Sequence, residues 1–153
     1  MRSEWDDLGI PNEDAYHPVE TADFGGRGRT DQQLYLRIPK RGTAFPAVVW
    51  FHGGGLTGGG REVPDALFDG RMAVIEARYR LSPEFPAPAA LADAVAATAW
   101  TLKRAEARGI DPERVFVGGM SAGAWLAAMT GMDRSYLAAY GIDSRKLAGL
   151  LLV

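Results

Sequence analysis

A glycine-flanked serine is the first feature of this sequence that could support chemistry, in the segment Gly119-Met120-Ser121-Ala122-Gly123. A serine at a sharp turn between a strand and a helix projects its hydroxyl group outward, and flanking glycines leave room for such a turn. The N-terminus of the following helix offers free backbone N–H groups and a favourable dipole to an oxyanion formed during acyl transfer. The segment therefore predicts Ser121 as a nucleophile and the N–H group of Ala122 as a donor to the oxyanion.

A second glycine-rich segment, His52-Gly53-Gly54-Gly55, follows the apolar run 48–51. The tetrahedral intermediate of acyl transfer carries a negative oxygen, which needs two or three N–H donors held in place in advance. Because glycine has no Cβ, its N–H group can approach a substrate closely. We therefore predict an oxyanion hole formed by the N–H groups of Gly54, Gly55 and Ala122.

The residues on either side of these glycines carry further predictions. His52 stands at the start of the loop and is expected to support it rather than to act as a base. Leu56 and Thr57 come directly after the glycines and are predicted to bind substrate by lining the acyl pocket.

The same glycines also fit a dinucleotide-binding pattern. Gly53, Gly55 and Gly58 have the G-x-G-x-x-G spacing after a strand, and Glu76 stands near the end of the next apolar run. In that motif a helix begins at the glycines so that its N-terminus binds the phosphates, but residues 58–64 are a poor helix start. The pattern also leaves Ser121 unexplained, so we consider it the weaker interpretation.

Short apolar runs alternate with longer helical patterns along most of the chain. Runs typical of strands lie at 34–38, 47–51, 72–75, 115–117 and 149–153, and helices are predicted at 88–108, 122–132 and 135–140. Strands that alternate with helices indicate an α/β fold, a mostly parallel sheet with helices on both faces. On the helix after the serine, Trp125 and Met129 are expected in the core.

The domain organisation is predicted from the same pattern. Residues 1–30 are polar and rich in turn formers and are expected to form an irregular N-terminal arm, whereas residues 31–153 form one α/β domain. Because the chain stops inside the run 149–153, the sheet is expected to be truncated after about its sixth strand. The whole is then the N-terminal part of a longer domain.

The composition excludes several classes of function. The 153 residues are 47% hydrophobic and 24% charged, with a net charge of −2 and no cysteine. A nucleic-acid surface is not expected, and no His, Asp and Glu cluster has metal-ligand spacing, so neither a metal nor a cofactor is predicted. No segment approaches the length of a membrane span, and the polar N-terminus does not resemble a signal peptide, which favours the cytoplasm.

Taken together, four segments in order resemble the α/β-hydrolase esterases and lipases: 52–55, 79–84, 93–100 and 119–123. They are most similar to the hormone-sensitive-lipase-like carboxylesterases and the bacterial feruloyl and acetyl-xylan esterases. The resemblance implies hydrolysis of a small-molecule carboxylic ester through an acyl-enzyme, with Ser121 as nucleophile and Gly54, Gly55 and Ala122 as the oxyanion hole. Asp93 is expected to support a helix or loop. Amide hydrolases of the kynurenine-formamidase type share the pattern, so the bond that is cut stays open.

The remaining members of a catalytic triad are missing from the chain. In this family the acid and then the histidine follow the nucleophile. After Ser121 the only acids are Asp133 and Asp143, no histidine follows, and His17 and His52 lie upstream. The chain alone is therefore expected to be inactive, and a non-catalytic α/β-hydrolase domain used for binding is the alternative.

Overall fold

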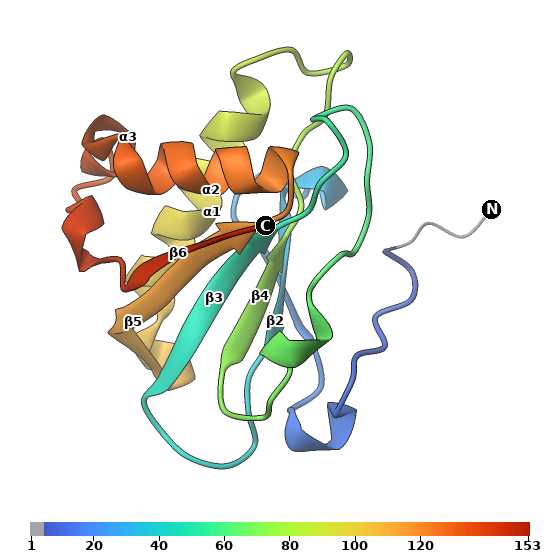
Figure 1. Cartoon of the computed structure of the whole chain (residues 1–153), viewed down its shortest axis with the longest axis vertical. Coiled ribbons are helices and arrows are strands. Elements are labelled where there is room, and N and C mark those ends of the chain that lie inside the picture. Colours follow the sequence, from blue (N-terminus) through green and yellow to red (C-terminus); the bar gives the residue numbers. More distant parts are fainter. Residues whose placement is uncertain (1–4) are drawn as a thin grey trace.

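The computed structural model describes residues 5–153, which form a six-stranded sheet flanked by three α-helices (Figure 1). The strands lie in the order β1 (Glu20–Asp23), β2 (Gln33–Arg37), β4 (Ala73–Ala77), β3 (Phe45–Phe51), β5 (Ile110–Gly119) and β6 (Gly149–Leu152). The pairs β4·β3, β3·β5 and β5·β6 are parallel, and β2 runs antiparallel to both β1 and β4. The predicted mostly parallel α/β sheet is confirmed.

The three α-helices lie on one face of this sheet. They are α1 (Ala89–Arg104), α2 (Ala122–Met132) and α3 (Arg134–Ala138), and all three contribute to one hydrophobic cluster with the sheet. Residues 10–16 and 63–72, which contain two short 3-10 turns, pack on the opposite face. The prediction of α-helices on both faces is therefore correct for one face only, because the connection from β3 to β4 crosses the second face without an α-helix.

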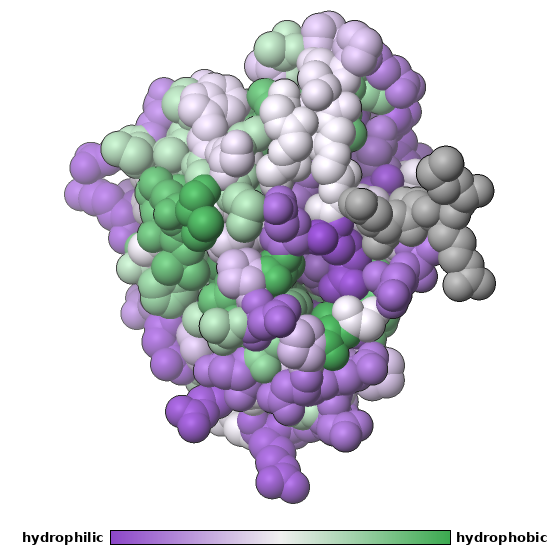
Figure 2. All heavy atoms as spheres, turned by 45° about the vertical axis from the view of Figure 1, so that its right-hand side comes forward, coloured by the Kyte–Doolittle hydropathy of each residue, from purple (hydrophilic) through white to green (hydrophobic). Residues whose placement is uncertain are grey.

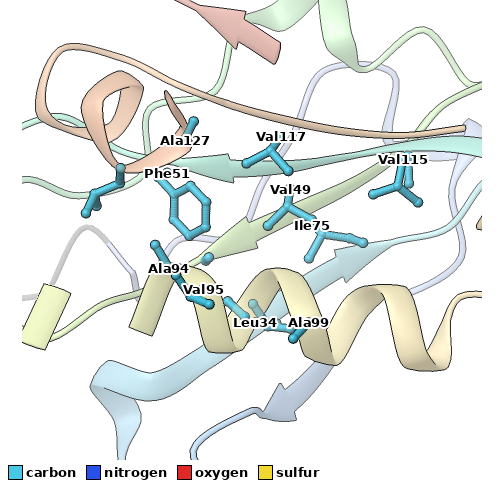
Figure 3. Close-up of a cluster of buried hydrophobic side chains, with 14 of the residues drawn as sticks. Leu34, Val49, Phe51, Ile75, Ala94, Val95, Ala99, Val115, Val117 and Ala127 are labelled. Carbon is cyan, nitrogen blue, oxygen red and sulfur yellow. The ribbon is translucent and has the colours of Figure 1, made fainter. Parts of the chain in front are cut away.

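Strand β3 is buried on both sides, as its continuous apolar run predicts. Val49 and Phe51 face the helices and belong to the larger core (Figure 3), whereas Val48 and Trp50 contribute to the smaller cluster on the other face. Because β3 lies between β4 and β5, the residues that follow it emerge at the middle of the sheet edge.

The predicted helices agree closely with the observed ones. The helix expected at 88–108 is α1 followed by a 3-10 turn, and Gly109 ends it in the left-handed conformation with φ 72°. The helix at 122–132 is observed with the same bounds, and the piece expected at 135–140 is α3. Strand β5 begins earlier than its apolar run because Ile110 already pairs with Phe45 of β3. The register is irregular over residues 111–114, and regular pairing resumes where Val115 lies opposite Ala47.

The prediction of an irregular arm over residues 1–30 is corrected in part. Residues 1–4 lie outside the described part of the chain, but β1 is a regular strand that pairs antiparallel with β2. Tyr16 is also buried, and its hydroxyl donates to the carbonyl of Met72 on the second face of the sheet. Short polar strands such as β1 lack apolar alternation, so only their pairing partner reveals them.

Candidate active site

Ser121 occupies the turn between β5 and α2, as predicted. Its backbone has φ 52° and ψ −114°, a conformation that costs an L-residue roughly 1–3 kcal/mol, and its side chain is exposed. The Ser121 N–H donates to the carbonyl of Val153 at 2.8 Å, and its own carbonyl accepts the N–H of Trp125 at the start of α2. These two bonds hold the strained residue between the sheet and the helix.

The two glycines around Ser121 are required by close backbone contacts. A Cβ added to Gly119 would lie 2.4 Å from the carbonyl carbon of Gly123, and one added to Gly123 would lie 2.0 Å from the carbonyl oxygen of Phe51. Both distances are far shorter than any real carbon contact. The first turn of α2 can therefore approach the ends of β3 and β5 only with glycine at these positions.

The glycine-rich loop after β3 lies directly against this turn. The N–H of Met120 donates to the carbonyl of Phe51 at 3.2 Å, so the two chains remain paired where both strands end. A Cβ added to Gly53 would lie 3.6 Å from the Cβ of Ser121. The structure thus brings together the two glycine motifs that the sequence singled out.

Three successive peptide groups of this loop have their carbonyl oxygens engaged. The carbonyl of His52 accepts the hydroxyl of Tyr79 at 2.6 Å, and that of Gly53 lies 2.6 Å from Nδ1 of His52. The carbonyl of Gly54 accepts the N–H groups of residues 57 and 58, both at 3.1 Å. In a trans peptide the N–H points away from the carbonyl, so these bonds also fix the directions of the N–H groups of Gly54 and Gly55.

The predicted oxyanion donors have no other hydrogen-bond partner in this structure. Within residues 5–153, the backbone N–H groups of Gly54, Gly55 and Ala122 donate to no acceptor. Both glycines are exposed and have positive φ values, 121° at Gly54 and 64° at Gly55. Free N–H groups on a backbone held in this way are what an oxyanion hole requires.

The predicted substrate-binding residues have different environments. Leu56 is half-buried against the main core, has φ 65°, and its carbonyl accepts the N–H of Ser82 at 2.8 Å. Thr57 is exposed, and its hydroxyl lies 3.3 Å from the carbonyl of Gly54. An open pocket of about 330 Å³ beside the loop is lined by residues 53, 54 and 59–62, and neither Leu56 nor Thr57 is among them. Their contact with substrate stays a prediction.

His52 is part of the support of the loop. Its ring is 4% exposed and stacks on the ring of Tyr79 with the centroids 4.3 Å apart. Burial, and then the charge of Glu62, raise the pKa of Tyr79 far above its usual value, so this hydroxyl stays protonated and donates to the carbonyl of His52. Tyr79 lies in the segment 79–84, but no local pattern predicts its role, because the contact joins a residue after β3 to a residue after β4.

Asp93 supports the fold, as expected, from a buried position in α1. Its carboxylate accepts the side chain of Gln32 at 2.8 Å and both the backbone N–H and the guanidinium of Arg80 at 2.8–2.9 Å. It therefore joins α1 to the residues before β2 and after β4, close to the loop that carries Tyr79.

Replacing this carboxylate is expected to destabilise the protein. Asp93→Asn should lower the free energy of unfolding by about 2–4 kcal/mol, because the partly buried Arg80 guanidinium loses the charge of the buried carboxylate with which it pairs. In urea titrations, Glu20→Gln is the control, since its pair with Arg108 is partly exposed and should contribute at most about 1 kcal/mol. Equal losses in the two variants would contradict this role of Asp93.

The acids that follow Ser121 are both engaged elsewhere. Asp133 lies at the opposite end of α2, where hydrogen bonds from Ser135 lower its pKa. Asp143 accepts the guanidinium of Arg145, which lowers its pKa to about 2. The backbone N–H of His17 donates to the carbonyl of Ile38, just after β2 ends. The end of β2 lies beside the start of β4, so His17 is at the opposite edge of the sheet from the carboxyl end of β5.

The dinucleotide interpretation fails on two observations. No α-helix follows Gly58 before Ala89, so no helix N-terminus is present to bind a pyrophosphate. Glu76, which would bind a ribose, is 2% exposed and forms an ion pair with Arg61 at 2.8 Å. Among the described residues, no group of three or more metal-ligating side chains is found.

The expectation that Trp125 belongs to the core is wrong. Its side chain is 48% exposed, whereas Met129 packs partly buried against the core as expected. Helix α2 is apolar all round, so its sequence does not show which face it buries. Figure 2 shows a hydrophobic area beside a largely hydrophilic surface. Within residues 5–153, the exposed large hydrophobic side chains are those of Trp125, Met132, Tyr140, Leu152 and Val153. No helix within residues 5–153 is long and apolar enough to cross a membrane.

Comparison with known proteins gives a consistent result. The carboxylic ester hydrolase LipN of Mycobacterium tuberculosis is 45% identical over 97 residues, which cover 60% of this chain and 26% of LipN. The carboxylesterase NlhH of the same species is 38% identical over 119 residues, covering 72% of this chain and 37% of NlhH. The solved structure of Thermogutta terrifontis esterase 2 phosphorylated by paraoxon is 28% identical, with a TM-score of 0.73 over 88% of this chain and 56% of that one.

The chain spans well under half the length of the two curated relatives it matches. The family match covers residues 48–142, from the middle of β3 to beyond α3, and includes both glycine motifs. It also includes Tyr79 and Asp93. This chain is a member of the α/β-hydrolase fold family.

Proposed function

We propose that this chain carries the nucleophile and oxyanion hole of a carboxylic ester hydrolase. Ser121 attacks the carbonyl carbon of the ester, the alcohol leaves, and water then hydrolyses the acyl-enzyme. The N–H groups of Gly54, Gly55 and Ala122 stabilise the negative oxygen of both tetrahedral intermediates. The observation that carries the proposal is the strained, exposed Ser121 packed against a loop with free N–H groups.

The related proteins support an ester as the substrate. LipN and NlhH are named as an ester hydrolase and a carboxylesterase. Phosphorylation of Thermogutta terrifontis esterase 2 by paraoxon supports the proposal that an organophosphate also reacts with Ser121 here.

The general base and its acid are proposed to come from outside these 153 residues. Neither Asp133 nor Asp143 is free, and neither His17 nor His52 is placed to take the proton of Ser121. The same observation favours a second candidate function, a binding domain that holds acyl compounds without cleaving them. The ester hydrolase and the binding domain would both bind acyl compounds, and only the hydrolase would cleave them.

The test is hydrolysis of matched substrates by the protein produced from its whole gene. We expect p-nitrophenyl acetate or butyrate to be cleaved, and the corresponding anilide to be cleaved at least about a hundredfold more slowly, because an amide is the poorer acyl donor. Faster cleavage of the anilide or of an N-formyl aromatic amine would indicate an amide hydrolase. Binding without turnover of any of them would favour the binding domain.

A further inference from the structure

The oxyanion loop, residues 52–62, is held at its far end by two charged residues. The loop contains six glycines, and such a sequence does not restrict its own backbone. At the end of the loop, the Arg61 guanidinium forms two bonds to the buried Glu76, at 2.8 and 2.9 Å. The backbone carbonyl of Glu62, the last residue, accepts the indole N–H of Trp50 at 2.5 Å.

The carboxylate of Glu62 reaches back to the beginning of the same loop. Its Oε2 accepts the backbone N–H of Gly53 at 3.2 Å. A Cβ added to Gly53 would lie 3.2 Å from this oxygen and 3.6 Å from the Cβ of Ser121, so Gly53 separates the carboxylate from the nucleophile. Glu62 is thus close to the reaction centre without contacting the reacting atoms.

The peptide group between His52 and Gly53 is therefore held at both of its ends. Tyr79 donates to its carbonyl oxygen, and Glu62 accepts from its N–H group. The next two peptide groups along the chain carry the free N–H groups of Gly54 and Gly55. A rotation of the first peptide group would change the directions of both donors, because the backbone connects them through two dihedral angles per residue.

We propose that Glu62 is a positioning residue that fixes the oxyanion loop through its hydrogen bond from the Gly53 N–H. The inference rests on the proposed function, since its purpose is to aim the N–H groups of Gly54 and Gly55. The requirement is an acceptor atom and not a charge, because a negative charge near the forming oxyanion opposes it. Glutamine at position 62 should therefore keep the position of the loop, because its side-chain oxygen can still accept the Gly53 N–H, whereas alanine has no acceptor.

The first test is kinetic and uses the protein produced from its whole gene with p-nitrophenyl acetate. Glu62→Ala should lower kcat about 10–100-fold with KM changed less than threefold, since misdirected donors act on the transition state. Glu62→Gln should keep kcat within about threefold of wild type. The matched control is Asp65→Ala, which removes an exposed carboxylate three residues after Glu62 and should leave kcat and KM unchanged.

The second test reports on the loop without catalysis. In the ¹⁵N-labelled protein produced from its whole gene, hydrogen exchange at the Gly53 amide should be at least about tenfold faster in Glu62→Ala than in wild type and in Glu62→Gln. A kcat of Glu62→Ala within threefold of an active wild type, or unchanged exchange at Gly53, would overturn the proposal. A wild type without esterase activity would overturn the proposed function instead, and the exchange measurement would still decide whether Glu62 fixes the loop.

Discussion

Replacing Ser121 by alanine should lower kcat for ester hydrolysis by a factor of about 10⁴–10⁶, with the fold retained. The loss is this large because the proposed mechanism forms the acyl-enzyme on this hydroxyl group. The residual rate would come from the oxyanion donors acting on attack by water. Rates with p-nitrophenyl acetate for the protein produced from its whole gene, together with circular dichroism of each variant, measure both quantities.

A glycine at the same position separates function from stability. The backbone of Ser121 has φ 52°, which glycine adopts without strain, so Ser121→Gly should raise the free energy of unfolding by about 1 kcal/mol while it abolishes activity. Ser82→Ala is the control, because the weak bond of that hydroxyl to Phe85 at 3.3 Å predicts little change in either quantity. Substantial activity in either Ser121 variant would contradict the role of Ser121.

Replacing Gly123 by alanine should destabilise the fold by about 3 kcal/mol or more. The new methyl group would lie 2.0 Å from the carbonyl oxygen of Phe51 and 2.6 Å from that of His52. Backbone atoms of a central strand cannot move aside cheaply, so the start of α2 must shift away from β3. Urea unfolding followed by circular dichroism gives the loss, and the displaced helix start should also reduce activity.

Gly131 provides a matched control in the same helix. A methyl group there would meet the Cδ2 of Leu150 at 2.7 Å, which is the flexible end of a side chain and can rotate away. Alanine also favours the helix by up to about 1 kcal/mol over glycine. Gly131→Ala should therefore lie within about 1 kcal/mol of wild type, and a Gly123→Ala variant of equal stability would contradict the packing argument.

The elements on either side of the turn at Ser121 could be predicted from the sequence. The helix 122–132 and the buried run before His52 have strong local patterns, and both glycine motifs stand at strand ends. Parallel strands bring their carboxyl ends to one edge of a sheet, so the meeting of Gly53 with Ser121 follows from topology. For this reason the position of the candidate site could be predicted before its geometry was known.

The support of the site could not be predicted in the same way. The contacts of Tyr79 and Glu62 with the loop join residues that no periodic pattern relates, and Glu62 stands in a glycine-rich segment without regular structure. The exposure of Trp125 was mispredicted because α2 is apolar on every side. Strand β1 is not predicted because its four residues, of which only Ala22 is apolar, form a strand only through their pairing with β2. In each of these cases tertiary contacts decide the structure.

The most direct test of the central claim is reaction with paraoxon, followed by mapping of the adduct by mass spectrometry. Ser121 Oγ should attack the phosphorus atom and release p-nitrophenolate, one equivalent per chain, in the protein produced from its whole gene. The proposed function predicts a single diethylphosphoryl group on the peptide that contains Ser121, and none in Ser121→Ala. No adduct under conditions that modify a control esterase, or an adduct that persists in Ser121→Ala, would contradict it.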